Sequence, residues 1–384
     1  MISKRVEKVP PSGIREFFDL VLSRPNIISL GVGEPDFIAP WRVRERAITA
    51  LEEGFTSYTS NKGLKVLRKL IASYLKKKYG LNYNSEDEIL ITVGVSQGLD
   101  LALRTIIDPQ DKVVVVSPHY VAYPALVELN LGKVVFLETT FQEDFKVNLK
   151  ELHRILKKEK PKAIILNYPS NPTGVTYSKE ELKRMWSILS KEDVVIISDE
   201  IYGEIVYKDS HTSLASLKGA KSKVILLNGF SKGWAMTGFR IGYACGPKRV
   251  IEGMMKIHSF SMLCAPIISQ IAGEEALKCW GEVEAMVKEY RRRRDFIVKE
   301  LDRIGLDTVK PEGAFYCFPS LKRYKIDSLE FAKRLLLEEK IAVVPGKAFG
   351  ASYQEFIRIS YANSLENLKE AIVRIERFLK NYGL

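Results

Sequence analysis

Cysteine and histidine are scarce in this chain, and neither is spaced as a metal site or a disulfide framework requires. Of 384 residues, four are cysteine and four are histidine. The cysteines are scattered without a Cys-x-x-Cys pair: Cys245, Cys264, Cys279 and Cys317. We therefore expect no disulfide framework, no bound metal and a reducing cytosol as the location.

Long apolar runs are also missing. No stretch approaches the roughly 20 apolar residues that a membrane-spanning helix needs. The first residues, Met1 to Pro10, lack the apolar core of a secretory signal. We expect a cytoplasmic protein without a membrane partner.

Negative charge falls short of positive charge, which leaves a net charge of +12 and raises the question of nucleic-acid binding. The densest basic run, Arg291–Arg294, lies inside a long helical stretch in which Glu289 precedes Arg293 by four residues. Such pairs are typical of a solvated helix face. We expect no nucleic-acid partner.

The order of elements predicts a layered α/β fold. A chain of 384 residues suggests two domains. Short apolar runs alternate with helical patterns, which indicates a mostly parallel sheet covered on both faces. The expected strands are Ile89–Thr92, Val113–Val116, Val134–Leu137, Ala163–Leu166, Val194–Ile197, Val224–Leu227 and Ile241–Ala244. The expected helices include Leu64–Tyr79, Gln97–Ile107, Tyr120–Leu131 and Lys179–Ser190.

After a long helix that begins near Gly281, the pattern changes to that of a smaller α+β unit. Its expected elements are the strands Asp307–Lys310, Ala314–Phe318 and Phe356–Ser360 and the helix Leu365–Leu379. The fold class we expect is α/β, with a large domain at residues 45–284 and a discontinuous small domain at residues 1–44 and 285–384.

Three polar segments directly follow three of the expected strands. Asp199 lies in Ser198-Asp-Glu-Ile-Tyr202, Lys232 ends Asn228-Gly-Phe-Ser-Lys232, and Asn171 lies in Asn167-Tyr-Pro-Ser-Asn171. Ligands of parallel sheets bind at the carboxyl ends of the strands. We expect these side chains to converge on one site.

Their chemistry suits reactions at the Cα of an amino acid, where a carbanion forms beside a carboxylate. A pyridine ring that is protonated and linked to a lysine as a Schiff base stabilises such a carbanion. The protein must then supply the lysine, a carboxylate for the ring nitrogen, donors to the ring oxygen and a phosphate cradle. Each of these groups is present in the three segments and the residues that follow them.

The segments resemble the class I aminotransferases, a family of fold-type I enzymes that depend on pyridoxal 5′-phosphate and include aspartate and aromatic aminotransferases. The resemblance runs from Ile28-Ser-Leu-Gly-Val-Gly33 to Phe356-Ile-Arg358. Its most specific part is a lysine signature in which an arginine follows the lysine by eight residues. Gly229-Phe-Ser-Lys232 and Arg240-Ile-Gly242 match this signature throughout.

The resemblance implies a role for each residue around the cofactor. Lys232 would carry the cofactor and move the proton between Cα and the cofactor, Asp199 would pair with the pyridine nitrogen, and Tyr202 and Asn171 would hydrogen-bond the ring oxygen. Tyr120 would stack on the ring. The implied phosphate ligands are Arg240, the backbone N–H groups of Val95 and Ser96, and Ser231, although Gly229 fills the place where the family usually has serine.

The resemblance also implies a substrate site and a partner. Arg358 would bind the substrate α-carboxylate, together with Gly33 and Asn171, and Ile14 would line the side-chain pocket. Tyr58 would reach the phosphate bound by a second copy of the chain, which makes a homodimer with shared active sites.

Other reactions remain open at this point. A C–S β-lyase or an aminocyclopropane-type synthase of the same fold shares the lysine, aspartate, tyrosine and arginine. A transcription regulator built on this fold would need an N-terminal winged-helix segment, for which we expect no room. A Ser–Lys hydrolase built on Ser231 and Lys232 is unfavourable because adjacent side chains diverge. We therefore expect transfer of an amino group from an amino acid to a 2-oxo acid such as 2-oxoglutarate.

Overall fold

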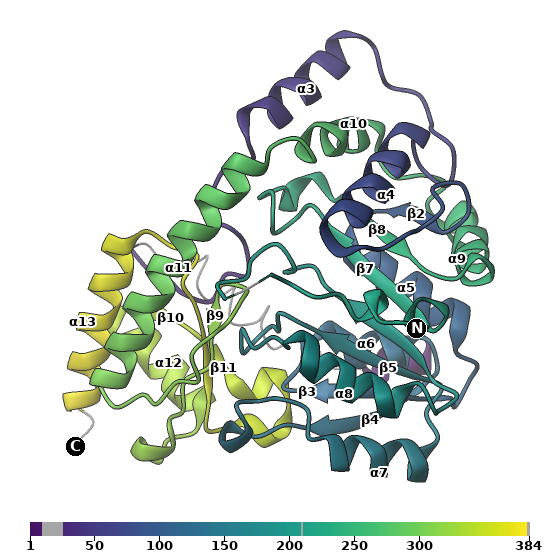
Figure 1. The fold of residues 1–384 in the computed structure, drawn as a ribbon. Helices are drawn as coiled ribbons and strands as arrows, with labels where there is room; N and C mark the ends of the chain where they lie inside the picture. The colour runs from purple at the N-terminus through teal and green to yellow at the C-terminus, as the bar shows by residue number, and fades with distance from the viewer. Residues whose placement is uncertain (10–25, 209, 382–384) are drawn as a thin grey trace.

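A large mixed sheet forms the centre of the molecule (Figure 1). The computed structural model describes residues 1–9, 26–208 and 210–381, and within them seven strands pair in the order β2-β8-β7-β6-β5-β3-β4. The strand β8 pairs antiparallel with both β2 and β7, and the other four strand pairs are parallel. The bounds are β2 (Ile89–Thr92), β3 (Lys112–Ser117), β4 (Lys133–Glu138), β5 (Ala163–Asn167), β6 (Val195–Asp199), β7 (Val224–Gly229) and β8 (Gly242–Cys245). The predicted α/β class and mostly parallel sheet are confirmed.

Helices cover both faces of this sheet. Successive side chains of a strand point to opposite faces, so neighbouring residues of one strand pack in different cores. Ile164 and Ile196 pack in one core, whereas Ile165 and Ile197 pack in the other. The first core contains side chains of α3 (Trp41–Glu52), α4 (Lys65–Tyr79), α7 (Leu149–Glu159), α8 (Lys179–Leu189) and α10 (Ile267–Ala276). The second contains side chains of α5 (Gly94–Ile106), α6 (Ala122–Leu129) and α9 (Lys248–Ser261).

Two of these helices, α7 and α8, begin at a short polar residue whose side chain caps the first turn. Asn148 accepts hydrogen bonds from the first turn of α7, and Ser178 forms a capping box with Glu181 at the start of α8. Each cap satisfies backbone N–H groups that lack a partner within the helix.

A smaller α+β unit packs beside the large sheet (Figure 1). It contains two small sheets with the orders β11-β12-β9 and β1-β10. The bounds of its elements are β1 (Ile28–Ser29), α11 (Trp280–Arg303), β9 (Tyr316–Cys317), α12 (Ser328–Glu339), β10 (Ile341–Ala342), β11 (Val344–Pro345), β12 (Ile357–Ser360) and α13 (Leu365–Asn381). A short helix, α1 (Lys4–Lys8), lies near the start of the chain.

The predicted strand Asp307–Lys310 is wrong. The backbone N–H of Thr308 donates to the carboxylate of Asp302, and the Thr308 hydroxyl donates to the carbonyl of Leu306. These local bonds occupy the donors of Thr308, and the segment forms a loop instead of joining a sheet.

The domain division at residues 44/45 and 284/285 stays a prediction. The long helix α11 passes through it: Val283 packs in the core of the large sheet, and Met286 packs in the core of the smaller unit. All four cysteines are unpaired. Within the described ranges, no helix combines the length and apolar character needed to cross a membrane.

Candidate active site

Five strands deliver polar residues to the same edge of the large sheet. The parallel strands β5, β6 and β7 end at this edge, where Asn167 pairs with Asp199. The antiparallel β8 begins at the same edge, because its first residue, Gly242, pairs with both Thr92 and Gly229. Residues that follow β2, β5, β6 and β7, and residues that precede β8, therefore converge.

A cavity of about 750 Å³ lies at this edge. Its lining includes Gly33, Val95, Ser96, Tyr120, Asn171, Asp199, Tyr202, Ser231, Lys232, Arg240 and Arg358. The structure thus brings together all of the predicted cofactor and substrate residues except Tyr58 and Ile14. Tyr58 is 83% exposed and does not line the cavity. Ile14 lies outside the described residues.

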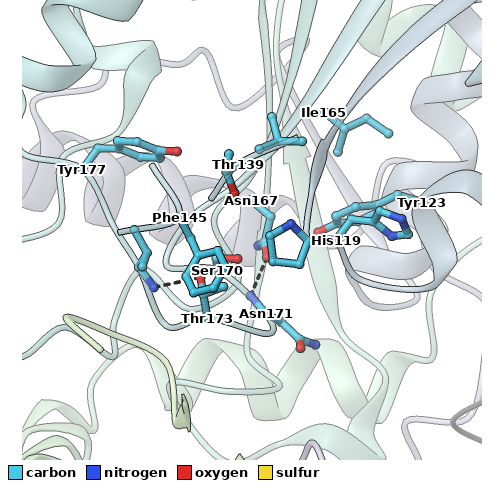
Figure 2. Close-up of a pocket in the computed structure, with 13 residues that line it drawn as sticks. His119, Tyr123, Thr139, Phe145, Ile165, Asn167, Ser170, Asn171, Thr173 and Tyr177 are labelled. Carbon is cyan, nitrogen blue, oxygen red and sulfur yellow. Dashed lines mark hydrogen bonds between the residues drawn. The ribbon is translucent and has the colours of Figure 1, made fainter. Parts of the chain in front are cut away.

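A second, much smaller cavity adjoins the first (Figure 2). Its volume of about 20 Å³ has room for roughly one water molecule. Tyr123, Asn167 and Asn171 line both cavities, so they separate the two spaces.

Lys232 follows β7 and reaches the cavity from the large sheet. Its Nζ donates to the backbone carbonyl of Gly33 at 2.6 Å. Desolvation lowers the pKa of the Lys232 ammonium to about 8, and the Glu34 carboxylate opposes this effect. The lowered pKa increases the fraction of Lys232 that is a neutral amine, the form that attacks a carbonyl carbon.

Asp199 ends β6 and is almost fully buried. The hydroxyl of Tyr123 donates to its Oδ2 at 2.8 Å, and the backbone N–H of Ile201 donates to its Oδ1 at 3.2 Å. Burial nevertheless raises the pKa of the Asp199 carboxyl to about 6. A cationic ring nitrogen near this carboxylate would favour its charged form.

The start of α5 and the side chain of Arg240 form an anion cradle. A Cβ at Gly94 would lie 2.8 Å from a guanidinium nitrogen of Arg240, so a larger residue would force the guanidinium to shift. Gly94 also has a φ of +72°, which favours glycine. The first backbone N–H groups of a helix lack helical partners, so those of Val95 and Ser96 add donors beside the guanidinium.

Arg358 enters from β12 of the smaller unit and is buried. Its two terminal nitrogens donate to Oδ1 of Asn171 at 2.9 Å and to the carbonyl of Gly31 at 2.5 Å. Its Nε is buried without a partner among the described residues. A carboxylate in the cavity would compensate the buried positive charge.

The predicted ring-oxygen ligands are also present. Tyr202 is buried, and its hydroxyl lies 2.9 Å from that of Tyr316. Asn171 is fixed because its backbone N–H donates to Oδ1 of Asn167. Tyr120 lines the cavity and stacks edge-on against Tyr123.

Sequence reasoning missed Tyr123, Asn167 and Tyr316. Tyr123 follows Tyr120 by three residues in an expected helix. Residues at this spacing lie on the same helix face, so the spacing could have placed Tyr123 beside Tyr120 at the site. Asn167 directly follows the expected strand Ala163–Leu166, and Asp199 lies just after the expected strand Val194–Ile197. Tyr316 reaches the cavity because it pairs with Ser360, two residues from Arg358, and this register has no local sequence signal.

The residues present fit pyridoxal 5′-phosphate as the implied cofactor. The cavity combines an amine with a lowered pKa, a buried carboxylate and a cradle that a Cβ at position 94 would fill. These groups match the aldehyde, the ring nitrogen and the phosphate of that molecule.

Comparisons with known proteins agree with this site. Residues 25–375 match the family model described as aminotransferase class I and II. The chain is 48% identical to the putative aminotransferase YugH of Bacillus subtilis, with 98% of each chain covered. It is 40% identical to aromatic-amino-acid aminotransferase 2 of Thermococcus litoralis, covering 100% of this chain and 99% of the relative.

A solved structure shares the whole fold. The aspartate aminotransferase of Thermus thermophilus with maleate superposes with a TM-score of 0.93 at 37% identity, covering 98% of this chain and 99% of that one. Similarity of this extent places the chain in the class I and II aminotransferase family, as an enzyme of the transaminase class.

Proposed function

We propose that this chain is a pyridoxal 5′-phosphate-dependent aminotransferase that moves an amino group from an L-amino acid to a 2-oxo acid by a ping-pong mechanism. The observation that carries the proposal is the convergence of Lys232, Asp199 and Arg358 on one cavity. The cationic Arg358 would bind the α-carboxylate of the amino acid, and the nucleophilic Lys232 would act at its Cα.

When bound, pyridoxal 5′-phosphate supplies an electron sink that stabilises negative charge on the substrate Cα. Lys232 would hold the cofactor. Its neutral amine would accept the proton from the substrate Cα and return it to the cofactor, a role that the lowered pKa of Lys232 favours. Asp199 would keep the pyridine nitrogen protonated.

Tyr202 and Asn171 hold the ring oxygen, and Tyr120 supports the ring face. Arg240, Ser231 and the first N–H groups of α5, at Val95 and Ser96, hold the phosphate. Arg358, Asn171 and the backbone of Gly33 orient the substrate carboxylate. These assignments rest on cavity lining, burial and the resemblance of the lysine signature.

Aromatic amino acids, aspartate or a related amino acid are the proposed donors, and 2-oxoglutarate is the proposed acceptor. The relatives named for aromatic amino acids and for aspartate support this range. A panel of amino donors with 2-oxoglutarate, scored by kcat/KM, identifies the preferred donor.

We further propose that the enzyme is a homodimer with shared active sites. Tyr58, in the loop before α4, is 83% exposed, and large apolar side chains of α3 are exposed nearby in the sequence. They are Trp41, Ile48 and Leu51. A second copy that covers these side chains would bring Tyr58 to the partner's phosphate cradle. The cytoplasmic location stays a prediction.

The test of the proposed function is covalent labelling. The purified protein should be yellow, and borohydride should fix the cofactor on Lys232, as read by peptide mapping. Lys232→Ala should abolish the label and the activity. A label on another lysine would overturn the assignment.

The β-lyase alternative makes a different prediction for the products. Release of ammonia and pyruvate that does not require 2-oxoglutarate would identify a lyase. Stoichiometric transfer of the amino group to 2-oxoglutarate supports the aminotransferase.

A further inference from the structure

Tyr316 occupies the point where the large sheet and the smaller unit meet in the cavity. It lies on β9 and is fully buried, yet its side chain lines the cavity. Its hydroxyl lies 2.9 Å from the hydroxyl of Tyr202, and its ring lies 4.5 Å from the guanidinium carbon of Arg358. A single side chain therefore contacts a proposed cofactor ligand and the proposed carboxylate ligand.

The Tyr316 hydroxyl lies close to the backbone of Gly33. A Cβ at Gly33 would lie 2.9 Å from this oxygen, so a larger residue at position 33 would displace it. Burial raises the pKa of both Tyr202 and Tyr316, which keeps both phenols protonated at neutral pH. Two protonated hydroxyls at this distance share one hydrogen bond, and one proton is left to donate elsewhere.

The direction of that shared bond decides what Tyr202 can do. If Tyr316 donates to the Tyr202 oxygen, the Tyr202 proton is free to donate to the ring oxygen of the cofactor. Hydrogen bonds in such a chain polarise each other, so Tyr202 becomes a stronger donor.

The ring of Tyr316 has a separate role at Arg358. The guanidinium lies near two aromatic rings, with its carbon 4.5 Å from the centre of the Tyr316 ring and 5.1 Å from the centre of the Phe349 ring. A desolvated cation over an aromatic face is attracted by the ring electrons. The two rings therefore restrict the plane in which Arg358 presents its donors.

We infer that Tyr316 is a positioning residue with two separable parts: its hydroxyl strengthens the donation of Tyr202 to the cofactor, and its ring orients Arg358 toward the substrate carboxylate. The inference deepens the proposed function and rests on it. The other titratable groups that act on the Tyr316 hydroxyl are Tyr120 and Glu34.

Two substitutions separate the hydroxyl from the ring. Tyr316→Phe removes only the hydroxyl, and Tyr316→Leu removes both parts. Tyr207→Phe is the matched control, because Tyr207 is buried in the same core but its hydroxyl donates to the carbonyl of Ala314, away from the cavity. Each variant is measured as the cofactor-loaded enzyme.

The first readout is the pH midpoint of the visible absorption change of the bound cofactor, which reports the donors to the ring oxygen. Tyr316→Phe should raise this midpoint by a few tenths of a pH unit, in the same direction as Tyr202→Phe and by less. The double variant Tyr202→Phe/Tyr316→Phe should match Tyr202→Phe alone, because the effect of the Tyr316 hydroxyl passes through Tyr202. Tyr207→Phe should leave the midpoint unchanged.

The second readout is KM across several amino donors. Tyr316→Phe should keep KM within about 2-fold, whereas Tyr316→Leu should raise it on the order of 5- to 30-fold for every donor. An unchanged midpoint in Tyr316→Phe, or additive midpoint shifts in the double variant, would overturn the hydroxyl role. An unchanged KM in Tyr316→Leu would overturn the ring role.

Failure of the inference is distinguishable from failure of the proposed function. If the wild-type protein binds no cofactor and has no visible band, both are overturned before any variant is made. If the wild-type protein has the band and the variants behave as Tyr207→Phe does, only the inference fails.

Discussion

The Asp199 carboxylate should destabilise the cofactor-free protein, because the fold buries a charge that the donors from Tyr123 and Ile201 and the charge of Lys232 compensate only in part. Asp199→Asn tests this directly. Asparagine has nearly the same volume and keeps an acceptor oxygen for the N–H of Ile201, but it carries no charge. The substitution therefore isolates the cost of ionisation in the buried site.

The expected change in unfolding free energy follows from the pKa of the Asp199 carboxyl, which burial raises from 3.8 to about 6. A group with a raised pKa in the folded state contributes stability below its unfolded pKa and loses it as the pH rises through the folded pKa. The folded and unfolded pKa values of Asp199 differ by about two, and each pKa unit corresponds to about 1.4 kcal/mol. The free energy of unfolding is therefore lower by roughly 3 kcal/mol at about pH 7.5 than at low pH. Asp199→Asn should recover roughly 1–3 kcal/mol of unfolding free energy there and about a third as much at about pH 4.5.

The assay is urea unfolding of the cofactor-free protein at both pH values and one protein concentration. Asp193→Asn is the control, because Asp193 precedes β6 and is exposed. Its substitution should change the unfolding free energy little at either pH. With cofactor present the wild type should be more stable than Asp199→Asn, because we expect the substitution to weaken cofactor binding. A variant no more stable than wild type at about pH 7.5, or one that gains equally at both pH values, would refute the reasoning.

Three further predictions concern the proposed ligands. Tyr202→Phe should raise the pH midpoint of the cofactor absorption band and leave substantial activity, since it removes one donor to the ring oxygen; a lowered midpoint would contradict this. Arg358→Lys should raise KM for every amino donor by about 10- to 100-fold, because a point charge replaces a planar fork. The buried Arg294→Lys, outside the cavity, should leave KM unchanged, and a loss confined to one donor would place Arg358 in the side-chain pocket instead. For the homodimer, a Lys232→Ala chain and a Tyr58→Asp chain should each be poorly active alone and should recover activity when refolded together; no recovery in proven heterodimers would rule out shared sites.

The large sheet was predictable because its strands are buried on both faces. All six residues of β7 are buried, for example, and such strands have continuous apolar runs in the sequence. The polar residues that follow these runs were therefore visible as candidates. The lysine signature from Gly229 to Gly242 identified the family because its residues act together within one short segment.

The parts that were missed depend on contacts between distant segments. The apolar run of β8 does not reveal its direction, which follows from the pairing of Gly229 with Gly242. The wrong strand at Asp307–Lys310 has a suitable composition, but a side chain of the preceding helix takes its backbone donor. Tyr316 could not be assigned to the cavity without the register of β9 against β12.

The contact of Arg358 with the carbonyl of Gly31 has a consequence for how the enzyme matures. These residues are separated by 327 positions, and Lys232 and Gly33, which also touch, are separated by 199. Contacts of such long range form late in folding, because a large loop must close before they contribute. A growing chain on the ribosome therefore lacks the proposed carboxylate site until residue 358 has been made. In refolding experiments, enzymatic activity should therefore return later than the helical signal in circular dichroism. Activity then reports that the segments around Gly31 and Arg358 have packed together.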